Sequence, residues 1–410
     1  KNIILNSYYI ESGSNTFRNY LERKIINNTN FNKNVWIRSK KFFDKNNVVG
    51  ISYYKDIDGN KQLITIQSTI FKQTCYIGWS FDYNTFNAFI DTAKANGITH
   101  IILEFILLIL NNNGTNDSIS FADTIQSWMN FTNDQRTTLL NKIRNNGMQL
   151  MASFAGATSF QSGFQDVLVS PNYDNPYVLG YDLAQWMYTY NCPAIDLDIE
   201  HIPNIETYPD TASLAVYIGQ LSDSIKSECN LLFGYYPQLS HAPQPPYFNG
   251  TQYYAYYGYV YSEVERLYGY AIDFYNIQYY NQGNYSYTDY NRMFTFDPDF
   301  NASVLQLIDP STIGSIYNYT AIPIYKIVVG KPSNENEVST QNGFVYLYSS
   351  DSSYTKTMAK YVVQNKTSTD TRLVEWYNTA GTMIWLYLTN QVSGYYPNSQ
   401  LLSYFNSTKH

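Results

Sequence analysis

Short apolar runs of strand length recur along the chain from residue 75 onward, and helical segments separate most of them. The expected strands are residues 75–81, 98–109, 148–155, 194–200, 230–237, 272–280, 323–330 and 381–387. The expected helices are residues 83–96, 133–146, 176–190, 209–228 and 355–364. Two helices end in an Asn-Gly pair, at 96–97 and 146–147, which is a common helix stop.

This alternation predicts an α/β fold, a closed (β/α)8 TIM barrel. An open doubly wound sheet would also alternate strands and helices. The sequence has no glycine-rich phosphate loop of the kind that such sheets often carry, so eight strands favour the barrel.

The first 74 residues differ in charge from the rest of the chain. They contain 12 Lys and Arg against 5 Asp and Glu, whereas the chain as a whole has a net charge of −7. Within them, 51–68 reads as two strands joined at Asp58-Gly59-Asn60, a β-hairpin pattern. We therefore expect a small basic N-terminal extension of unknown role (1–74), a barrel (75–395) and a C-terminal tail (396–410). The basic extension either has a solvated surface or docks onto an acidic body, in this chain or in a neighbour, which would give self-association.

The composition narrows the classes of partner. Charged residues make up only 14% of the chain, and 43 tyrosines raise the aromatic share to 17%. Such surfaces suit stacking and neutral hydrogen bonds, as in carbohydrate binding or self-association, although an AT-rich genome gives the same bias. We expect no nucleic-acid partner.

The sequence also bears on cofactors and location. The four histidines are scattered and the three cysteines allow at most one internal disulfide, so we expect no metal and no other cofactor. The longest apolar run, 98–110, is broken by His100 and Glu104, so it predicts a buried strand rather than a membrane span. Ten Asn-X-Ser/Thr sequons favour a secreted or extracellular glycoprotein.

Three carboxyl groups crowd the fourth expected strand, in "AIDLDIE" at 194–200. Asp196, Asp198 and Glu200 alternate with apolar residues, so in a strand they share one face. Close like charges raise the pKa of at least one carboxyl group. A half-exposed strand with a solvated acidic face would explain the pattern, and so would a catalytic use. In a (β/α)8 barrel the acids would point inward, with Glu200 at the catalytic end of the strand.

At this point the sequence resembles a known family. The acid strand is similar to the D-x-x-D-x-D-x-E signature of glycoside hydrolase family 18, the chitinases and their relatives, with Pro193 where the first Asp is usual. Four further motifs follow the family order. They are "QLMASFAGATS" (149–159) for S-x-G-G, "FGYYPQ" (233–238) for A-A-P-Q, "YNIQYYNQ" (275–282) for the Q-F-Y-N-N of class III chitinases, and "GTMIW" (381–385) for G-x-M-x-W.

The resemblance implies a mechanism in which the N-acetyl oxygen of the substrate attacks the anomeric carbon. Glu200 would be the general acid, Asp198 would orient the acetamido group, and Asp196 would share a proton with Asp198. Tyr280 would donate a hydrogen bond to the acetamido oxygen. The implied substrate contacts are Trp385 as the apolar floor, Gln278 and Gln238 as polar contacts at the rim, and Trp79 on the first strand. Both tryptophans could instead be core residues.

The implied function is retaining endo-hydrolysis of β-1,4-linked N-acetylglucosamine polymers such as chitin, with an N-acetylglucosamine-containing polysaccharide as partner. Two alternatives remain open. One is an endo-β-N-acetylglucosaminidase that acts on N-glycans with the same chemistry. The other is a non-catalytic chitin-binding or self-assembling coat or storage protein on the same barrel.

Overall fold

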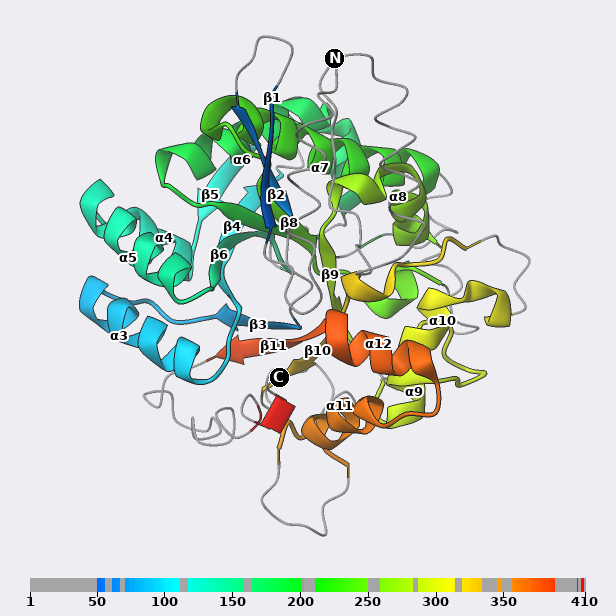
Figure 1. The fold of residues 1–410 in the computed structure, drawn as a ribbon. Helices are drawn as coiled ribbons and strands as arrows, with labels where there is room; N and C mark the ends of the chain where they lie inside the picture. Colours follow the sequence, from blue (N-terminus) through cyan, green and yellow to red (C-terminus); the bar gives the residue numbers. More distant parts are fainter. Residues whose placement is uncertain are drawn as a thin grey trace.

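The central feature of the structure, a computed structural model, is a closed barrel of eight parallel strands with helices around it (Figure 1). The structure describes residues 50–55, 61–66, 71–110, 117–157, 159, 164–200, 202, 211–249, 259–282, 287–313, 319–333, 345–348, 356–387, 404 and 407–408. The closed ring of eight parallel strands with helices between them confirms the predicted (β/α)8 barrel.

The barrel strands pair in the order β3, β4, β6, β7, β8, β9, β10, β11, and β11 closes the ring by pairing with β3. Their bounds are β3 Lys72–Ile77, β4 His100–Ile109, β6 Gln149–Ala155, β7 Ala194–Asp198, β8 Gln238–His241, β9 Phe274–Gln278, β10 Ile327–Pro332 and β11 Gly381–Tyr387. The short strand β5, Ser118–Phe121, adds to β4 in the antiparallel direction.

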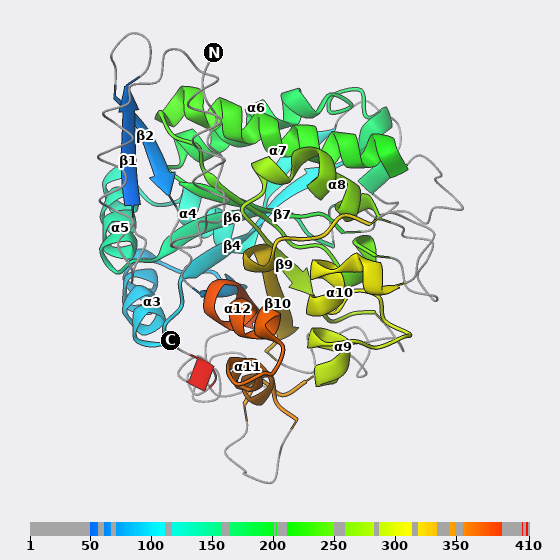
Figure 2. The same cartoon turned by 45° about the vertical axis from the view of Figure 1, so that its right-hand side comes forward.

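Helices surround the barrel, with α3 to α5 on the left and α9 and α10 on the right in Figures 1 and 2. The helices between barrel strands are α3 Tyr83–Ala95, α4 Asp123–Met129, α5 Asn133–Asn145, α6 Pro176–Thr189, α7 Thr211–Phe233, α8 Val260–Tyr268, α9 Tyr290–Phe294, α10 Val304–Ile308, α11 Met358–Lys366 and α12 Thr371–Thr379. None of the described helices combines the length and the apolar character needed to cross a membrane.

Helix ends follow local sequence signals. Helix α5 begins with a capping box in which the side chains of Thr132 and Gln135 each accept a hydrogen bond from the other's backbone N–H. Gly97 and Gly147, the glycines of the two predicted stop signals, have φ of 77° and 71° just after α3 and α5. A left-handed residue at this position ends a helix at little steric cost when it is glycine.

The predicted hairpin is present as β1, Gly50–Lys55, paired antiparallel with β2, Lys61–Ile66. It forms a separate two-stranded sheet. The predicted turn at 58–60 and the remainder of the basic extension before residue 50 lie outside the described residues, and so does most of the tail after residue 387.

The first barrel strand begins at Lys72, three residues before the expected start at Cys75. Lys72, Gln73 and Thr74 are polar, so their burial in the strand leaves no apolar signal in the sequence. Their polar groups have partners instead. The Lys72 ammonium donates to Tyr325 O, and the Gln73 amide donates to the hydroxyl of Thr408, in the expected tail, over 2.6 Å.

The fifth barrel strand is not where the sequence predicted it. Residues 230–237 were expected as a strand, but α7 continues to Phe233 and β8 begins only at Gln238. Gly234, with φ of 76°, ends the helix, and its N–H donates to Asn230 O. A short apolar run fits a helix end as well as a strand, and the real strand, "QLSH", has almost no apolar character.

The barrel interior and the layer between strands and helices hold two separate apolar clusters. On β4, Ile101 and Leu103 belong to the outer cluster and Ile102 to the inner one, as strand alternation requires. The inner cluster is Tyr76, Ile102, Met151, Ala194, Ala242, Phe274, Tyr280, Val328, Met383 and Leu386. It includes Tyr76 and Tyr280, which also belong to the polar site described below.

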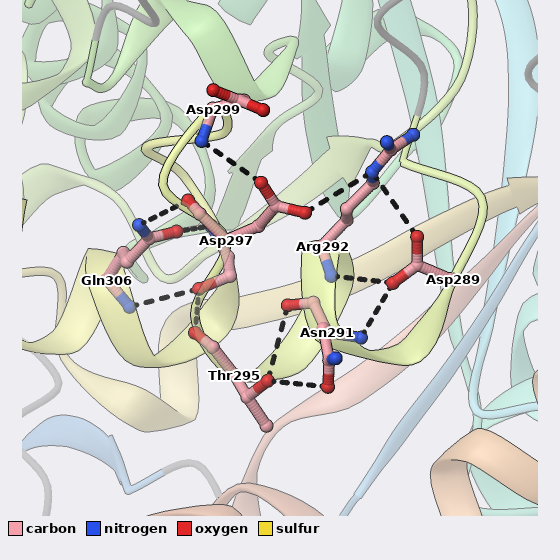
Figure 3. Close-up of polar contacts among 8 residues, drawn as sticks. Asp289, Asn291, Arg292, Thr295, Asp297, Asp299 and Gln306 are labelled. Atoms are coloured by element: carbon pink, nitrogen blue, oxygen red, sulfur yellow. Dashed lines mark hydrogen bonds and ion pairs between the residues drawn. The ribbon is translucent and has the colours of Figure 1, made fainter.

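A polar network holds the connection between β9 and β10 (Figure 3). Asp289 caps α9 by accepting hydrogen bonds from the N–H groups of Asn291 and Arg292. The Arg292 guanidinium lies 3.3 Å from Asp289 and 3.4 Å from Asp297, and Gln306 donates to Asp297 O. This network ties α9 to α10 within the connection between β9 and β10.

Candidate active site

Asp196 lies at the centre of a hydrogen-bond network inside the barrel. Its side chain has no solvent exposure and accepts hydrogen bonds from four side chains on four other strands. The donors are Tyr76 Oη (2.6 Å), Ser153 Oγ (3.0 Å), Ser240 Oγ (2.5 Å) and Asn276 Nδ2 (3.3 Å). Burial raises the pKa of Asp196, and the four hydrogen bonds oppose that rise.

The pKa of Asp198 is raised further above its ordinary value than that of Asp196. Four donors occupy the two oxygens of Asp196, which is the arrangement of an ionised, acceptor-only carboxylate. Asp198 is 3% exposed, and its pKa is raised well above the ordinary value, first by burial and then by the charges of Glu200, Asp196 and Glu104. Two close carboxyl groups do not ionise together at low cost, so each negative charge that forms here makes the next ionisation harder.

Gln278 joins Asp198 to Glu200. Its Nε2 lies 2.8 Å from Asp198 Oδ1 and 3.0 Å from Glu200 Oε1, and also donates to Ala242 O. Gln278 is 3% exposed, so it is a buried link between two acids rather than the rim contact that the sequence predicted. Glu200 is half-buried and stands two residues past the end of β7, at the C-terminal end of the barrel strands, where the active sites of (β/α)8 enzymes lie.

Tyr280 stands two residues past the end of β9, as Glu200 stands two residues past the end of β7. It is 3% exposed and belongs to the inner cluster. Burial and the charges of Asp198, Glu200 and Glu104 raise the pKa of its phenol well above the ordinary value, so the hydroxyl stays protonated and able to donate.

The two tryptophans occupy different surroundings. Trp385, on β11, is half-buried, with its ring centroid 5.2 Å from that of Tyr76 and 5.8 Å from that of Phe105. Trp79, just past β3, contacts both apolar clusters, and its ring lies 5.9 Å from Phe89 of helix α3. Trp385 therefore adjoins the acids through Tyr76, whereas Trp79 sits at the border between barrel and helix.

Gln238 is not with the other candidate residues, so its predicted role as a substrate contact is wrong. It is the first residue of β8, and its Oε1 lies 3.1 Å from Nε2 of His100, the first residue of β4. Strands of one parallel barrel start at the same end, which is opposite the acids. The motif was misplaced because Pro237-Gln238 resembles A-A-P-Q, while Ala242-Pro243-Gln244 fits it better and directly follows β8.

Sequence reasoning missed several residues of the site. Tyr76, Ser240 and Asn276 all bind Asp196, and each lies on the inward face of its strand. Period-two alternation could have placed Tyr76 and Asn276 inward, once the strand positions were known. Glu104 was considered only as a break in an apolar run. Within the described residues, no three His, Cys, Asp or Glu side chains are grouped as a metal ion would require.

The sequence matches no family model and no curated protein sequence. Among solved structures, the chain is similar to a GH18 chitinase from Pseudoalteromonas aurantia, with a TM-score of 0.50 and 20% identity over 82% of this chain and 99% of that one. It is also similar to the C-terminal domain of ChiA from Legionella pneumophila, with a TM-score of 0.53 and 19% identity over 82% of this chain and 97% of that one. The chain thus has the fold of GH18 chitinases.

Proposed function

We propose that the protein hydrolyses β-1,4-linked N-acetylglucosamine polymers with retention, through participation of the substrate's own acetamido group. The observation that carries this proposal is the bridge from Gln278 to both Asp198 and Glu200, which brings two acids together at the catalytic end of a GH18-like barrel. A secreted or extracellular location would bring the enzyme to such polymers.

In the proposed reaction, the acetamido oxygen attacks the anomeric carbon while the bond to the leaving glycosidic oxygen breaks. Glu200 gives its proton to that leaving oxygen. Asp198 hydrogen-bonds the acetamido N–H and stabilises the positive oxazolinium. Water then opens this intermediate from the same face, and the Glu200 carboxylate takes its proton.

The remaining residues would position the substrate. The neutral Tyr280 phenol donates to the acetamido oxygen, and Trp385 offers its indole face to the sugar ring. Ionised Asp196 lies beneath Asp198 and favours the protonated or hydrogen-bonded state of its neighbour.

The test is hydrolysis of a fluorogenic chitotriose by the wild type, by Glu200→Gln and by a control, Glu375→Gln on the outer helix α12. We expect Glu200→Gln to lose about 10²–10⁴-fold in kcat, since that is the usual contribution of a general acid. The dissociation constant for chitotriose should stay nearly unchanged, and Glu375→Gln should match the wild type.

Two results would contradict the proposal. A folded wild type that binds chitin oligomers but turns over none of them between pH 4 and 8 would support the binding or assembly alternative. Release of reducing ends from an N-glycan core, without cleavage of chitotriose, would support the endo-β-N-acetylglucosaminidase alternative.

A further inference from the structure

Two consecutive residues of β4, Glu104 and Phe105, both face the mouth of the barrel. Leu103 pairs with Ala152 of β6 and Ile106 pairs with Phe154, so β4 has two residues between these pairs where β6 has one. Such a bulge lets neighbouring side chains share a face that strand alternation would otherwise deny to one of them, and bulges recur beside active sites.

Contacts on each side of the bulge show this inward direction. Glu104 lies two residues after Ile102, which belongs to the inner cluster, so the two share a face of the strand. The Phe105 ring stacks on Trp385 at 5.8 Å. Gly156 makes room for that ring, because a Cβ there would lie 3.1 Å from Phe105.

Neighbouring residues leave space for the Glu104 carboxyl group and hold the backbone of Glu104 in place. A Cβ at Gly78 would lie 2.5 Å from Glu104 Oε1 and 2.3 Å from Leu386 Cδ2, so only glycine leaves space for both side chains. The Thr124 hydroxyl holds the backbone, since it accepts from Glu104 N over 2.7 Å and donates to Glu104 O over 2.8 Å. Glu104 is 4% exposed.

We propose that Glu104 is a positioning residue of the site, a fourth carboxylate buried at the barrel mouth whose negative charge acts on Asp198 and, through it, on the general acid Glu200. This inference rests on the proposed hydrolysis, because a general acid must be protonated when the substrate binds.

The titratable groups around the site agree with this role of Glu104. In its ionised form Glu104 raises the pKa of Asp198, after burial and the charges of Glu200 and Asp196, and it also raises the pKa of Tyr280. Several titratable groups interact electrostatically with Glu104, with Asp198 or with both. They are Asp196 and Glu200 from the β7 segment, Tyr280 from the β9 segment, Tyr76 and Cys75 from β3, and Tyr261 from α8. All of them are acids, so each charge that forms makes the next ionisation harder.

The experiment compares the wild type with Glu104→Gln, which removes the charge and keeps the shape, and with Glu104→Asp, which keeps the charge. Asp134→Asn, an exposed carboxyl on α5, is the control. We expect the basic limb of the kcat/KM profile to move down by about 0.5–1 pH unit in Glu104→Gln, because a neighbouring negative charge has been removed. Glu104→Asp should recover most of the shift, and Asp134→Asn should show none.

A second measurement does not depend on activity. Carbon-13 NMR titration of the aspartate carboxyl groups, with Asp198 assigned through Asp198→Asn, should show Asp198 ionising at lower pH in Glu104→Gln than in the wild type. This shift would support the Glu104 role even if the protein proved inactive, so the two proposals fail separately. An unchanged Asp198 titration in a folded Glu104→Gln would overturn the role, whether or not its melting temperature falls.

Discussion

At the scale of single residues, the candidate site is a set of carboxyl groups made different by their partners. Asp196 accepts hydrogen bonds from four donors. Asp198 accepts a hydrogen bond from Gln278 and lies near three other carboxyl groups, whose negative charges raise its pKa. The sequence showed that the acids share a face and crowd one another. It did not show how their pKa values differ, because that depends on donors from strands far away in the chain.

The raised pKa of Asp198 leads to a prediction about stability and pH. A carboxyl group whose pKa is higher in the folded state stabilises the fold below its unfolded value, and this contribution is lost as pH rises through the folded value. Asp198→Asn has no ionisable carboxyl group at this position, so its stability does not depend on pH in this way. We expect the wild type to lose stability relative to Asp198→Asn as pH rises from about 4 to 8, by up to about 1.4 kcal/mol per unit of raised pKa.

Urea unfolding at pH 4, 6 and 8 measures this difference, with Asp134→Asn as the exposed control. Free energies of unfolding that stay parallel for the wild type and Asp198→Asn across this range would refute a raised pKa at Asp198.

At the scale of elements, apolar runs located most of the barrel strands, and Asn-Gly pairs located two helix ends. The strand segments that the apolar runs did not locate are polar. Lys72, Gln73 and Thr74 of β3 are buried and have hydrogen-bond partners. On β8, Ser240 is buried inside the barrel and His241 is buried against the helices α7 and α8. Buried polar residues give no hydrophobic signal, because their burial depends on partners that the fold supplies. The same limit hid Glu104.

The end of α7 provides a prediction for one element. Gly234 has φ of 76°, and a Cβ there would meet nothing within 4 Å, so the cost of a side chain is conformational alone. We expect Gly234→Ala to lower the free energy of unfolding by about 1 kcal/mol, and Gly234→Asn to cost less, since Asn tolerates this conformation.

The control for this change is Leu231→Ala, on the same helix end, where the side chain is 76% exposed. It should change the free energy of unfolding in urea by less than about 0.5 kcal/mol. Equal losses in Gly234→Ala and Leu231→Ala would show that the positive φ is not what limits this position.

At the scale of the whole molecule, burial separates sequons that look alike in the sequence. Asn249 is 1% exposed and donates to Asn301 O, and Asn365 is fully buried and accepts from the Tyr290 hydroxyl. Asn130, just after α4, is exposed. A glycan requires a surface asparagine in the folded protein, so the number of sequons overstates the number of usable sites.

We therefore predict glycan at Asn130 and none at Asn249 or Asn365 when the protein is made through a eukaryotic secretory pathway. Mass spectrometry of peptides from the folded, secreted fraction, before and after enzymatic removal of N-glycans, makes the comparison. Glycan at Asn249 or Asn365 in that fraction would contradict the packing described for these two side chains.

The four donors to Asp196 also make the two halves of the barrel depend on each other. Tyr76 and Ser153 come from strands before Asp196 in the chain, and Ser240 and Asn276 come from strands after it. A chain cut between β7 and α7 would leave the carboxylate with half of its donors in each fragment. Neither fragment could then hold the site alone, and recovery of the network would require the two to reassociate as complementary pieces.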